Sequence, residues 1–237
     1  MKELINLRRF YFCALFTDVI NHYVNTSIIK QAINKKLISV ETINFRDFST
    51  NNYHQVDDYQ YGGSAGMVLM IEPVVKALAS IDQTNRYIIL LSPRGQTLTQ
   101  QKAIELANMD KDLVFLCGHY EGFDERINSY VDEYLSIGDY VLTSGELAGL
   151  VCLDAIVRLI PNVINPVSLA SESFNDYLLD HPVYTKPAVF NSQTVPEILL
   201  SGHHAKIAQY RLNERIRLTK KYRPDLYQLY LKSQEKK

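Results

Sequence analysis

Short apolar runs alternate with longer amphipathic stretches along the first two thirds of the chain. The runs Phe10–Phe16, Ile88–Leu91 and Leu113–Cys117 have the length of buried strands. The stretch Gly145–Ile160 carries apolar residues at helical spacing, and Pro161 is expected to end that helix. This alternation predicts an α/β fold in which helices cover a largely parallel sheet.

Turn and capping residues predict further elements. Ser92–Gly95 is expected to form a turn. Thr97 and Gln100 have the spacing of a capping box, which predicts a helix that ends near residue 108. Additional helices are predicted over Phe123–Val131, Phe174–Leu179 and His203–Tyr222.

Two of the predicted strands lead into polar loops that contain glycine and acidic residues. One loop begins at Gly118, after the strand 113–117, and the other covers residues 137–146, before the long helix. In open α/β sheets, ligands bind just beyond the carboxyl ends of the strands. The two loops are therefore predicted to form the walls of one ligand site.

Several polar residues near these loops have a structural and a functional interpretation. Asp124 and Arg126 can form an ion pair or belong to a site, and Glu121 is the stronger site candidate. Asp139 and Glu146 could instead cap the following helix or interact with its dipole. The glycine-rich segment Tyr61–Met67 lacks the pattern of a phosphate-binding loop, so a plain turn and a site both remain open.

Composition and charge indicate the kind of protein and the partner it binds. The chain has 237 residues, 46% of them hydrophobic, and no apolar run long enough to cross a bilayer. Its three scattered cysteines fit neither a disulfide framework nor a zinc site, which indicates the cytoplasm. Residues 1–185 hold 14 Lys and Arg against 22 Asp and Glu, whereas residues 186–237 hold 11 against 4. The basic end, with tyrosines among its charges, favours RNA as a partner over a merely solvated helix face.

Read together, the motifs resemble the bacterial tRNA (guanine-N1)-methyltransferase family. The matching strings run through nearly the whole chain in the family's order. They are YGGSAGM (61–67), LSPRGQ (91–96), CGHYEGFDER (117–126), SIGDYVLTSGEL (136–147), RLIP (158–161), LLDHPVYTKP (178–187) and VPEILLSGHHAKI (195–207).

The resemblance implies a fold, partners and a place in the cell. The expected fold is a SPOUT-type α/β domain with a trefoil knot, over residues 1–161, followed by a linker over 162–175 and a small helical tRNA-binding domain over 176–237. The expected partners are tRNA and a second copy of the chain in a homodimer, with neither DNA nor a membrane, in the cytoplasm.

The resemblance also implies a reaction, the transfer of a methyl group from S-adenosylmethionine to N1 of guanosine at tRNA position 37. Mg²⁺ is an additional implied requirement, without a metal site in the protein itself. The residues expected to bind the cofactor are Leu91, Ser92, Gly118, Ile137, Gly138, Asp139, Tyr140, Val141, Leu142 and Gly145.

The resemblance also implies catalytic residues: Glu121, Arg158 and a carboxylate that acts as the base. Glu121 is expected near the methionine part of the cofactor or the target base, and Arg158 at the guanine O6. The family's usual base is an Asp before Ser-Phe, where this chain has Glu172. Glu172 is therefore predicted to accept the N1 proton, with Asp180 as the alternative.

Other departures from the family pattern affect the expected rate and cofactor affinity. Phe16-Thr17 stands for Phe-Pro, Ser64-Ala65 for Gly-Pro, Ser144 for glycine and Ala148 for proline. The rival interpretations are a methyltransferase that acts on a ribose 2′-hydroxyl and a tRNA-binding protein without catalysis. Because Glu121, Asp139 and Arg158 are all retained, the enzyme is favoured.

Overall fold

The computed structural model describes residues 7–170 and 172–235, which form two compact units divided between Ile164 and Asn165. The division falls inside the range 162–175 that was predicted as a linker, and residues 165–175 belong to the second unit. The described residues before the division are called unit 1, and those after it unit 2.

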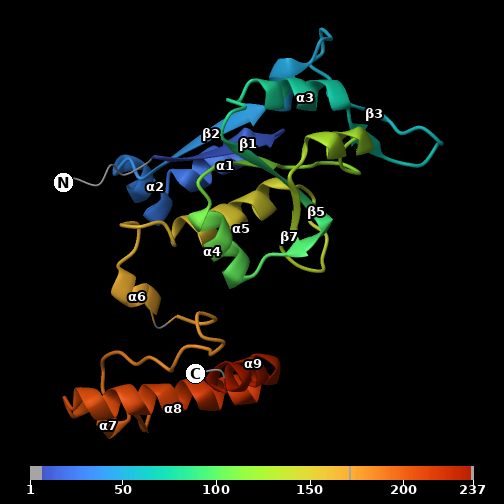
Figure 1. Cartoon of the computed structure of the whole chain (residues 1–237). Coiled ribbons are helices and arrows are strands. Elements are labelled where there is room, and N and C mark those ends of the chain that lie inside the picture. Colours follow the sequence, from blue (N-terminus) through green and yellow to red (C-terminus); the bar gives the residue numbers. More distant parts are fainter. Residues whose placement is uncertain (1–6, 171, 236–237) are drawn as a thin grey trace. The chain divides into compact units, whose positions relative to one another are not determined.

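Five strands of unit 1 form one parallel sheet in the order β2-β1-β6-β5-β7 (Figure 1). They are β1 (Arg8–Ala14), β2 (Ile38–Asn44), β5 (Arg86–Thr97), β6 (Asp112–Leu116) and β7 (Glu133–Ser136). The prediction of an α/β fold with a parallel sheet is confirmed. Because all five strands run in the same direction, their carboxyl ends lie at one edge of the sheet.

Side chains of the sheet alternate between two hydrophobic cores, as expected for strands that are covered on both faces. Along β1, Phe10 and Phe12 belong to one core, and Tyr11 and Cys13 to the other. The first face is covered by α1 (Thr17–Val24), α2 (Ser27–Asn34), α4 (Gln100–Asn108) and α5 (Glu146–Val157). Helix α3 (Ile71–Ala79) packs on the second face, opposite α4 and α5 (Figure 1).

Short elements complete unit 1. The antiparallel pair β3 (Asp57–Tyr59) and β4 (Met67–Leu69) encloses the glycine-rich segment, and two 3₁₀ helices cover Phe45–Phe48 (η1) and Glu125–Tyr130 (η2). Residues 7–170 and 172–235 contain no helix with the length and apolar character that a membrane span requires.

Three local predictions for unit 1 were wrong. Ser92–Gly95 lies within the bounds of β5 and not in a turn between elements. It forms a bulge, because Leu91 and Gln96 both pair with Leu135 of β7 and the four residues between them have no partner in that strand. The cap of α4 is Thr99, whose hydroxyl accepts from the Lys102 amide at 3.2 Å, and not Thr97.

The predicted helix over Phe123–Val131 is also shorter than expected. Only the 3₁₀ helix η2 forms, after Asp124, whose carboxylate accepts from the Arg126 amide at 2.9 Å. The predicted helix over Gly145–Ile160 is confirmed in type, and it ends with Arg158 as its C-cap.

Unit 2 is built from helices, a short antiparallel strand pair and irregular segments. Its elements are α6 (Pro166–Ala170), β8 (Val189–Phe190), β9 (Gln193–Thr194), α7 (Glu197–Leu200), α8 (His204–Tyr222) and α9 (Pro224–Gln234). The long helix predicted over 203–222 is confirmed as α8. The helix predicted over 174–179 was wrong, because Phe174 (φ 78°) and Tyr177 (φ 66°) adopt the left-handed conformation, which interrupts a right-handed helix.

Candidate active site

A pocket of about 450 Å³ lies in unit 1, where β6 and β7 end and β5 shifts register. That volume falls in the range typical of small-molecule sites, about 300–1,000 Å³. The pocket brings together all the predicted cofactor residues except Asp139, which is exposed on the loop after β7. The predicted residues that line it are Leu91, Ser92, Gly118, Ile137, Gly138, Tyr140, Val141, Leu142 and Gly145.

Two glycines allow the loops after β6 and β7 to meet at this pocket. The Gly145 amide donates to the Gly118 carbonyl at 2.7 Å. A Cβ on Gly145 would lie 2.7 Å from the Gly118 nitrogen and 2.8 Å from the Cys117 Cα, closer than real Cβ atoms approach backbone. This part of the wall is therefore main chain, whose polar groups suit hydrogen bonding to a heterocyclic ring.

The loop after β7 folds against itself and presents apolar side chains. The Ser136 hydroxyl accepts from the Gly138 amide at 3.2 Å and donates to its carbonyl at 3.1 Å. Gly138 has φ 145°, and the Tyr140 ring lies where its Cβ would be. Tyr140 and Val141 remain exposed, which leaves an apolar rim on the pocket.

Glu121 lies in the pocket lining, as predicted, and contacts the glycine-rich segment. Its amide donates to the Met67 carbonyl at 3.0 Å, and its side chain occupies the space that a Cβ on Gly66 would need. Gly66 also has φ 96°. The glycine-rich segment is thus a neighbour of a candidate site residue. Glycine is favoured at position 66 by its positive φ and by the closeness of the Glu121 side chain.

A second carboxylate in the pocket is paired with a cation. Arg94 donates to both oxygens of Glu125 at 2.9 and 2.8 Å, and this hydrogen bonding holds the pKa of Glu125 below its ordinary value. Both residues line the pocket. Glu125 belongs to the polar set that follows the strand 113–117 in sequence but was not predicted as a site residue. Arg94 was assigned to a turn; its position two residues after Ser92 was the available signal.

Asp124 and Arg126 form the ion pair that was one of the two interpretations of these residues. Their side chains form an ion pair at 2.6 Å, and the hydrogen bonds from Arg126 lower the pKa of Asp124. Glu146 is not a pocket residue either: it is buried at the start of α5 and accepts from the Phe16 amide at 3.1 Å.

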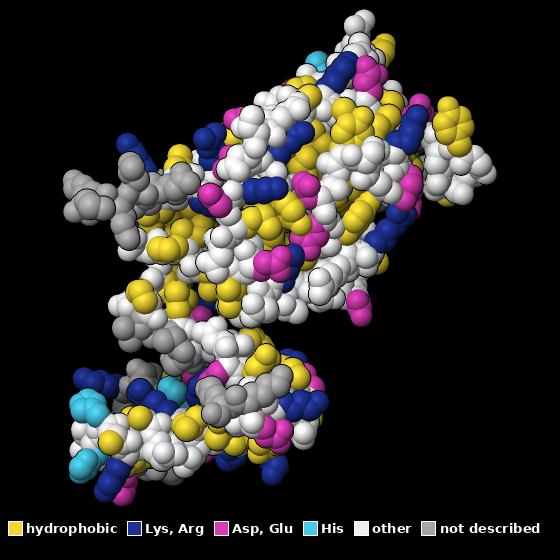
Figure 2. All heavy atoms as spheres, in the orientation of Figure 1, with side chains coloured by type: hydrophobic (Ala, Val, Ile, Leu, Met, Phe, Trp, Pro, Cys, Tyr) yellow, Lys and Arg dark blue, Asp and Glu magenta, His cyan; other side chains and the backbone are white. Residues whose placement is uncertain are grey.

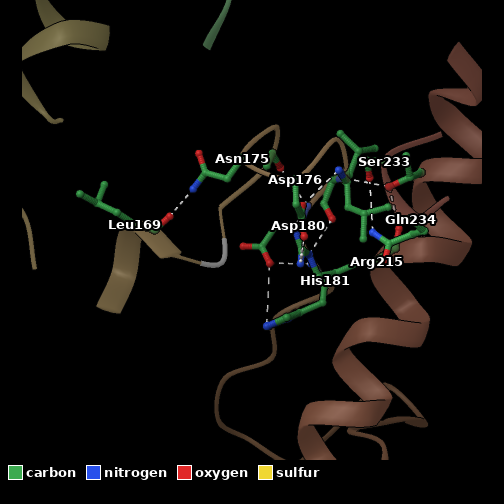
Figure 3. Close-up of polar contacts among 12 residues, drawn as sticks. Leu169, Asn175, Asp176, Asp180, His181, Arg215, Ser233 and Gln234 are labelled. Carbon is green, nitrogen blue, oxygen red and sulfur yellow. Dashed lines mark hydrogen bonds and ion pairs between the residues drawn. The ribbon is translucent and has the colours of Figure 1, made fainter. Parts of the chain in front are cut away.

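The other three candidate catalytic residues lie outside the lining of this pocket. Arg158 is partly buried at the C-terminal end of α5 in unit 1. Glu172 and Asp180 belong to unit 2, where the Asp180 amide donates to the Ser173 hydroxyl at 2.9 Å. His181 lies beside Asp180, with 3.8 Å between the Nε2 and Oδ1 atoms (Figure 3).

In the part of the chain that the structure describes, no three His, Cys, Asp or Glu side chains are grouped as metal ligands.

A parallel sheet with a glycine-walled pocket at its carboxyl edge is the arrangement at which α/β proteins bind small ligands. The comparisons with known proteins make the class specific. The sequence profile of the tRNA (Guanine-1)-methyltransferase TrmD family matches residues 8–229, so this chain belongs to that family. The resemblance drawn from the motifs is confirmed.

Curated relatives agree with this assignment over nearly their whole length. A tRNA (guanine-N(1)-)-methyltransferase of Ureaplasma urealyticum is 52% identical over 222 residues, 94% of this chain and 97% of the relative. One of Mycoplasma capricolum is 51% identical over 218 residues, 92% and 91% of the two chains. One of Shouchella clausii is 48% identical over 220 residues, 91% and 90%.

Proposed function

We propose that this chain is a tRNA (guanine-N1)-methyltransferase that uses S-adenosylmethionine and acts on guanosine 37. Family membership over residues 8–229 supports the reaction class. The single structural observation that carries the proposal is the contact between Gly118 and Gly145, because it forms a main-chain wall for a heterocyclic ligand at the edge where α/β proteins bind cofactors.

The pocket fits the chemistry of S-adenosylmethionine, which supplies an electrophilic methyl group on a sulfonium sulfur. Main-chain groups near Gly118 and Gly145 would hold the adenine between the apolar side chains of Leu91, Ile137 and Leu142. Carboxylates in the lining suit a ligand that carries positive charge. Asp139 keeps its predicted place in the cofactor loop, although it is outside the pocket lining.

The proposed catalytic groups address the low nucleophilicity of neutral guanine N1, which carries a proton. The carboxylate of Glu172, or of Asp180 in its place, accepts that proton as the bond from N1 to the methyl carbon forms and the sulfur–carbon bond breaks. Arg158 stabilises the negative charge that develops on O6. Glu121 orients the methionine part of the cofactor or the target base.

Unit 2 is proposed to hold the tRNA. Figure 2 shows Lys, Arg and His side chains on the visible face of this unit. The segment 186–237 has 11 Lys and Arg against 4 Asp and Glu, and phosphate binding by such residues releases counterions. Tyr222 is exposed beside Lys221, which offers an aromatic face for a base.

A homodimer is proposed as the working form. Phe16, Val19 and Tyr23, at α1, and Leu147 and Val151, on α5, are large hydrophobic residues that stay exposed in unit 1. A second copy of the chain would cover this apolar surface. Sedimentation velocity at micromolar concentration is expected to give a dimer, and V151D is expected to shift it to monomer.

The experiment that tests the function measures methyl transfer from labelled S-adenosylmethionine. One tRNA transcript has guanosines at positions 36 and 37, and the control has adenosine at 37. Label recovered as 1-methylguanosine from the first transcript alone is the expected result. A 2′-O-methylated nucleoside would favour the ribose enzyme, and tight binding of both ligands without transfer would favour the catalytically inactive binding protein.

A further inference from the structure

The segment 172–181 of unit 2 contains neither helix nor strand, yet it is tied at several points (Figure 3). The Asn175 side-chain amide reaches back to the Leu169 carbonyl of α6. The Ser173 hydroxyl accepts from the Asp180 amide at 2.9 Å and closes the loop. Glu172 and Asp180, the proposed base and its alternative, therefore flank the two ends of one closed loop.

Helix α8 holds this loop through the nearly buried side chain of Arg215. Its two terminal nitrogens donate to the two Asp176 oxygens at 3.0 and 2.6 Å, and its Nε donates to the Leu179 carbonyl at 3.2 Å. The Arg215 side chain is only 11% exposed, so this bidentate pair is more strongly held than a fully solvated ion pair.

A second contact comes from Thr219, one helical turn further along α8. Its hydroxyl donates to the Arg215 carbonyl at 2.7 Å and accepts from the Leu179 amide at 2.8 Å. Thr219 is fully buried, and the neighbouring Leu178 is the one buried hydrophobic residue in the described part of unit 2. Loss of the hydroxyl would leave a loop amide without its partner in a dry environment.

The loop needs such support because two of its residues are strained. Phe174 and Tyr177 have φ angles of 78° and 66°, a conformation that costs non-glycine residues about 1–2 kcal/mol each. Strained backbone persists only where surrounding contacts hold it. The hydrogen bonds from Arg215 and Thr219 stabilise this loop in its strained conformation.

We infer that Arg215 and Thr219 are positioning residues, which orient the carboxylate of Glu172 for proton transfer through the loop 173–180. The inference rests on the proposed function and deepens it. It also places the orientation of the base on α8, the helix that carries much of the positive charge of unit 2. Contacts of tRNA phosphates with α8 would thereby act on the same rigid element that holds the base.

The test compares Thr219→Val, which removes both hydroxyl contacts at equal size, with Thr219→Ser, which keeps them. Steady-state kinetics on the guanosine-36,37 transcript should give about a tenfold or larger fall in kcat for T219V, because small misplacements of a catalytic group are costly. The KM for tRNA and the Kd for S-adenosylmethionine should stay within about twofold. T219S should restore kcat.

The pH dependence of kcat separates positioning from stability. In T219V the rate should rise further toward high pH than in wild type, because hydroxide replaces a misplaced base. A purely structural role would leave the profile shape unchanged. Equal kcat values and pH profiles for T219V and T219S, or a loss confined to KM, would overturn the inference.

A second variant and a second measurement protect the test against misfolding. Asp176→Asn removes the charge of the exposed partner of Arg215 and keeps an oxygen that can accept from the Leu178 amide. It should lower kcat in the same direction as T219V, at unchanged KM. Amide exchange at Leu179 should accelerate in T219V but not in T219S; acceleration without any fall in kcat would refute the positioning role. Absence of methyl transfer by the wild-type chain would instead overturn the proposed function itself.

Discussion

The two units hold their candidate residues in different ways. Unit 1 places its pocket on a parallel sheet with a hydrophobic core on each face, and the pocket wall at Gly118 and Gly145 is main chain. Unit 2 has few buried side chains and holds its two carboxylates on a loop fixed by hydrogen bonds to α8. Under the proposed function, cofactor binding would depend on backbone packing, whereas proton transfer would depend on a small number of side-chain contacts.

The largest expected effect tests the side-chain part of this comparison. Glu172→Gln keeps the size of the side chain but removes its basicity, so kcat should fall by about 100-fold or more, as for loss of a general base. Binding of S-adenosylmethionine, measured by calorimetry, should be unchanged. Asp180→Asn is the matched control and should have a smaller effect; full activity of E172Q would assign the base elsewhere.

The next effect tests the backbone part. Gly145→Ala forces a Cβ against the main chain at Gly118, which should lower the free energy of unfolding by about 1–3 kcal/mol and weaken cofactor binding. Gly202 offers the contrast in unit 2, because its φ is 71° but no atom lies within 4 Å of the position that a Cβ would take. Gly202→Ala should cost only about 1 kcal/mol and leave cofactor affinity intact. Chemical denaturation and calorimetry check both; unaltered cofactor affinity in G145A would contradict the backbone wall.

A third test concerns the buried cysteines, all of which lie in unit 1. Burial raises the pKa of Cys13 and Cys152 from 9.0 to about 12, and it raises the pKa of Cys117 well above 9.0. Unfolded thiols lose their protons first, so this contribution to stability is complete below pH 9 and is lost progressively between pH 9 and 12.

The expected loss is about 1.4 kcal/mol per thiol for each pH unit above about 9. Denaturation curves at about pH 8, 9 and 10 measure it. Cys152→Ala should make the fall of the unfolding free energy with pH less steep, by the contribution of one thiol. An identical slope would show that the Cys152 thiol does not remain protonated in the folded state.

The smallest effect is expected from an exposed ion pair on α3. Lys76 donates to Glu72 at 2.7 Å at helical i,i+4 spacing, with both side chains largely exposed. Glu72→Gln should change the free energy of unfolding by about 0.3–0.5 kcal/mol at low salt, less at high salt. A change larger than that of G202A would reverse the proposed ranking of surface and backbone effects.

Periodicity predicted those parts of the fold in which one strand or helix has an unambiguous pattern. The buried strand predicted over 10–16 is β1 (Arg8–Ala14), and the apolar helix predicted over 145–160 is α5 (Glu146–Val157). Ser92–Gly95 was interpreted as the end of the strand because a Ser-Pro-Arg-Gly string is typical of a turn. The strand resumes after this bulge, where Gln96 pairs with Leu135 of β7, a partner remote in sequence. The residues that neighbour this segment in sequence give no information about its contact with β7.

Partners that are remote in sequence also explain why the helix predicted over 174–179 was wrong and why two residues of the pocket were not predicted. The loop near Phe174 is fixed by α8, about 40 residues away, and not by its own helical propensity. Nine of the ten residues that the resemblance implied for the cofactor line the pocket, because they belong to motifs that directly follow the ends of strands. Arg94 and Glu125, 31 positions apart, meet only in the folded chain.

The main-chain wall at Gly118 and Gly145 has a consequence for inhibitors. A compound that bound chiefly to those backbone groups would present few side chains whose replacement could exclude it. Any larger residue at Gly145 would collide with the neighbouring loop before it reached the compound. Resistance by single substitution at this wall would thus carry a direct loss of the enzyme's own fold, which makes the backbone edge a more durable target than the exposed rim at Tyr140 and Val141.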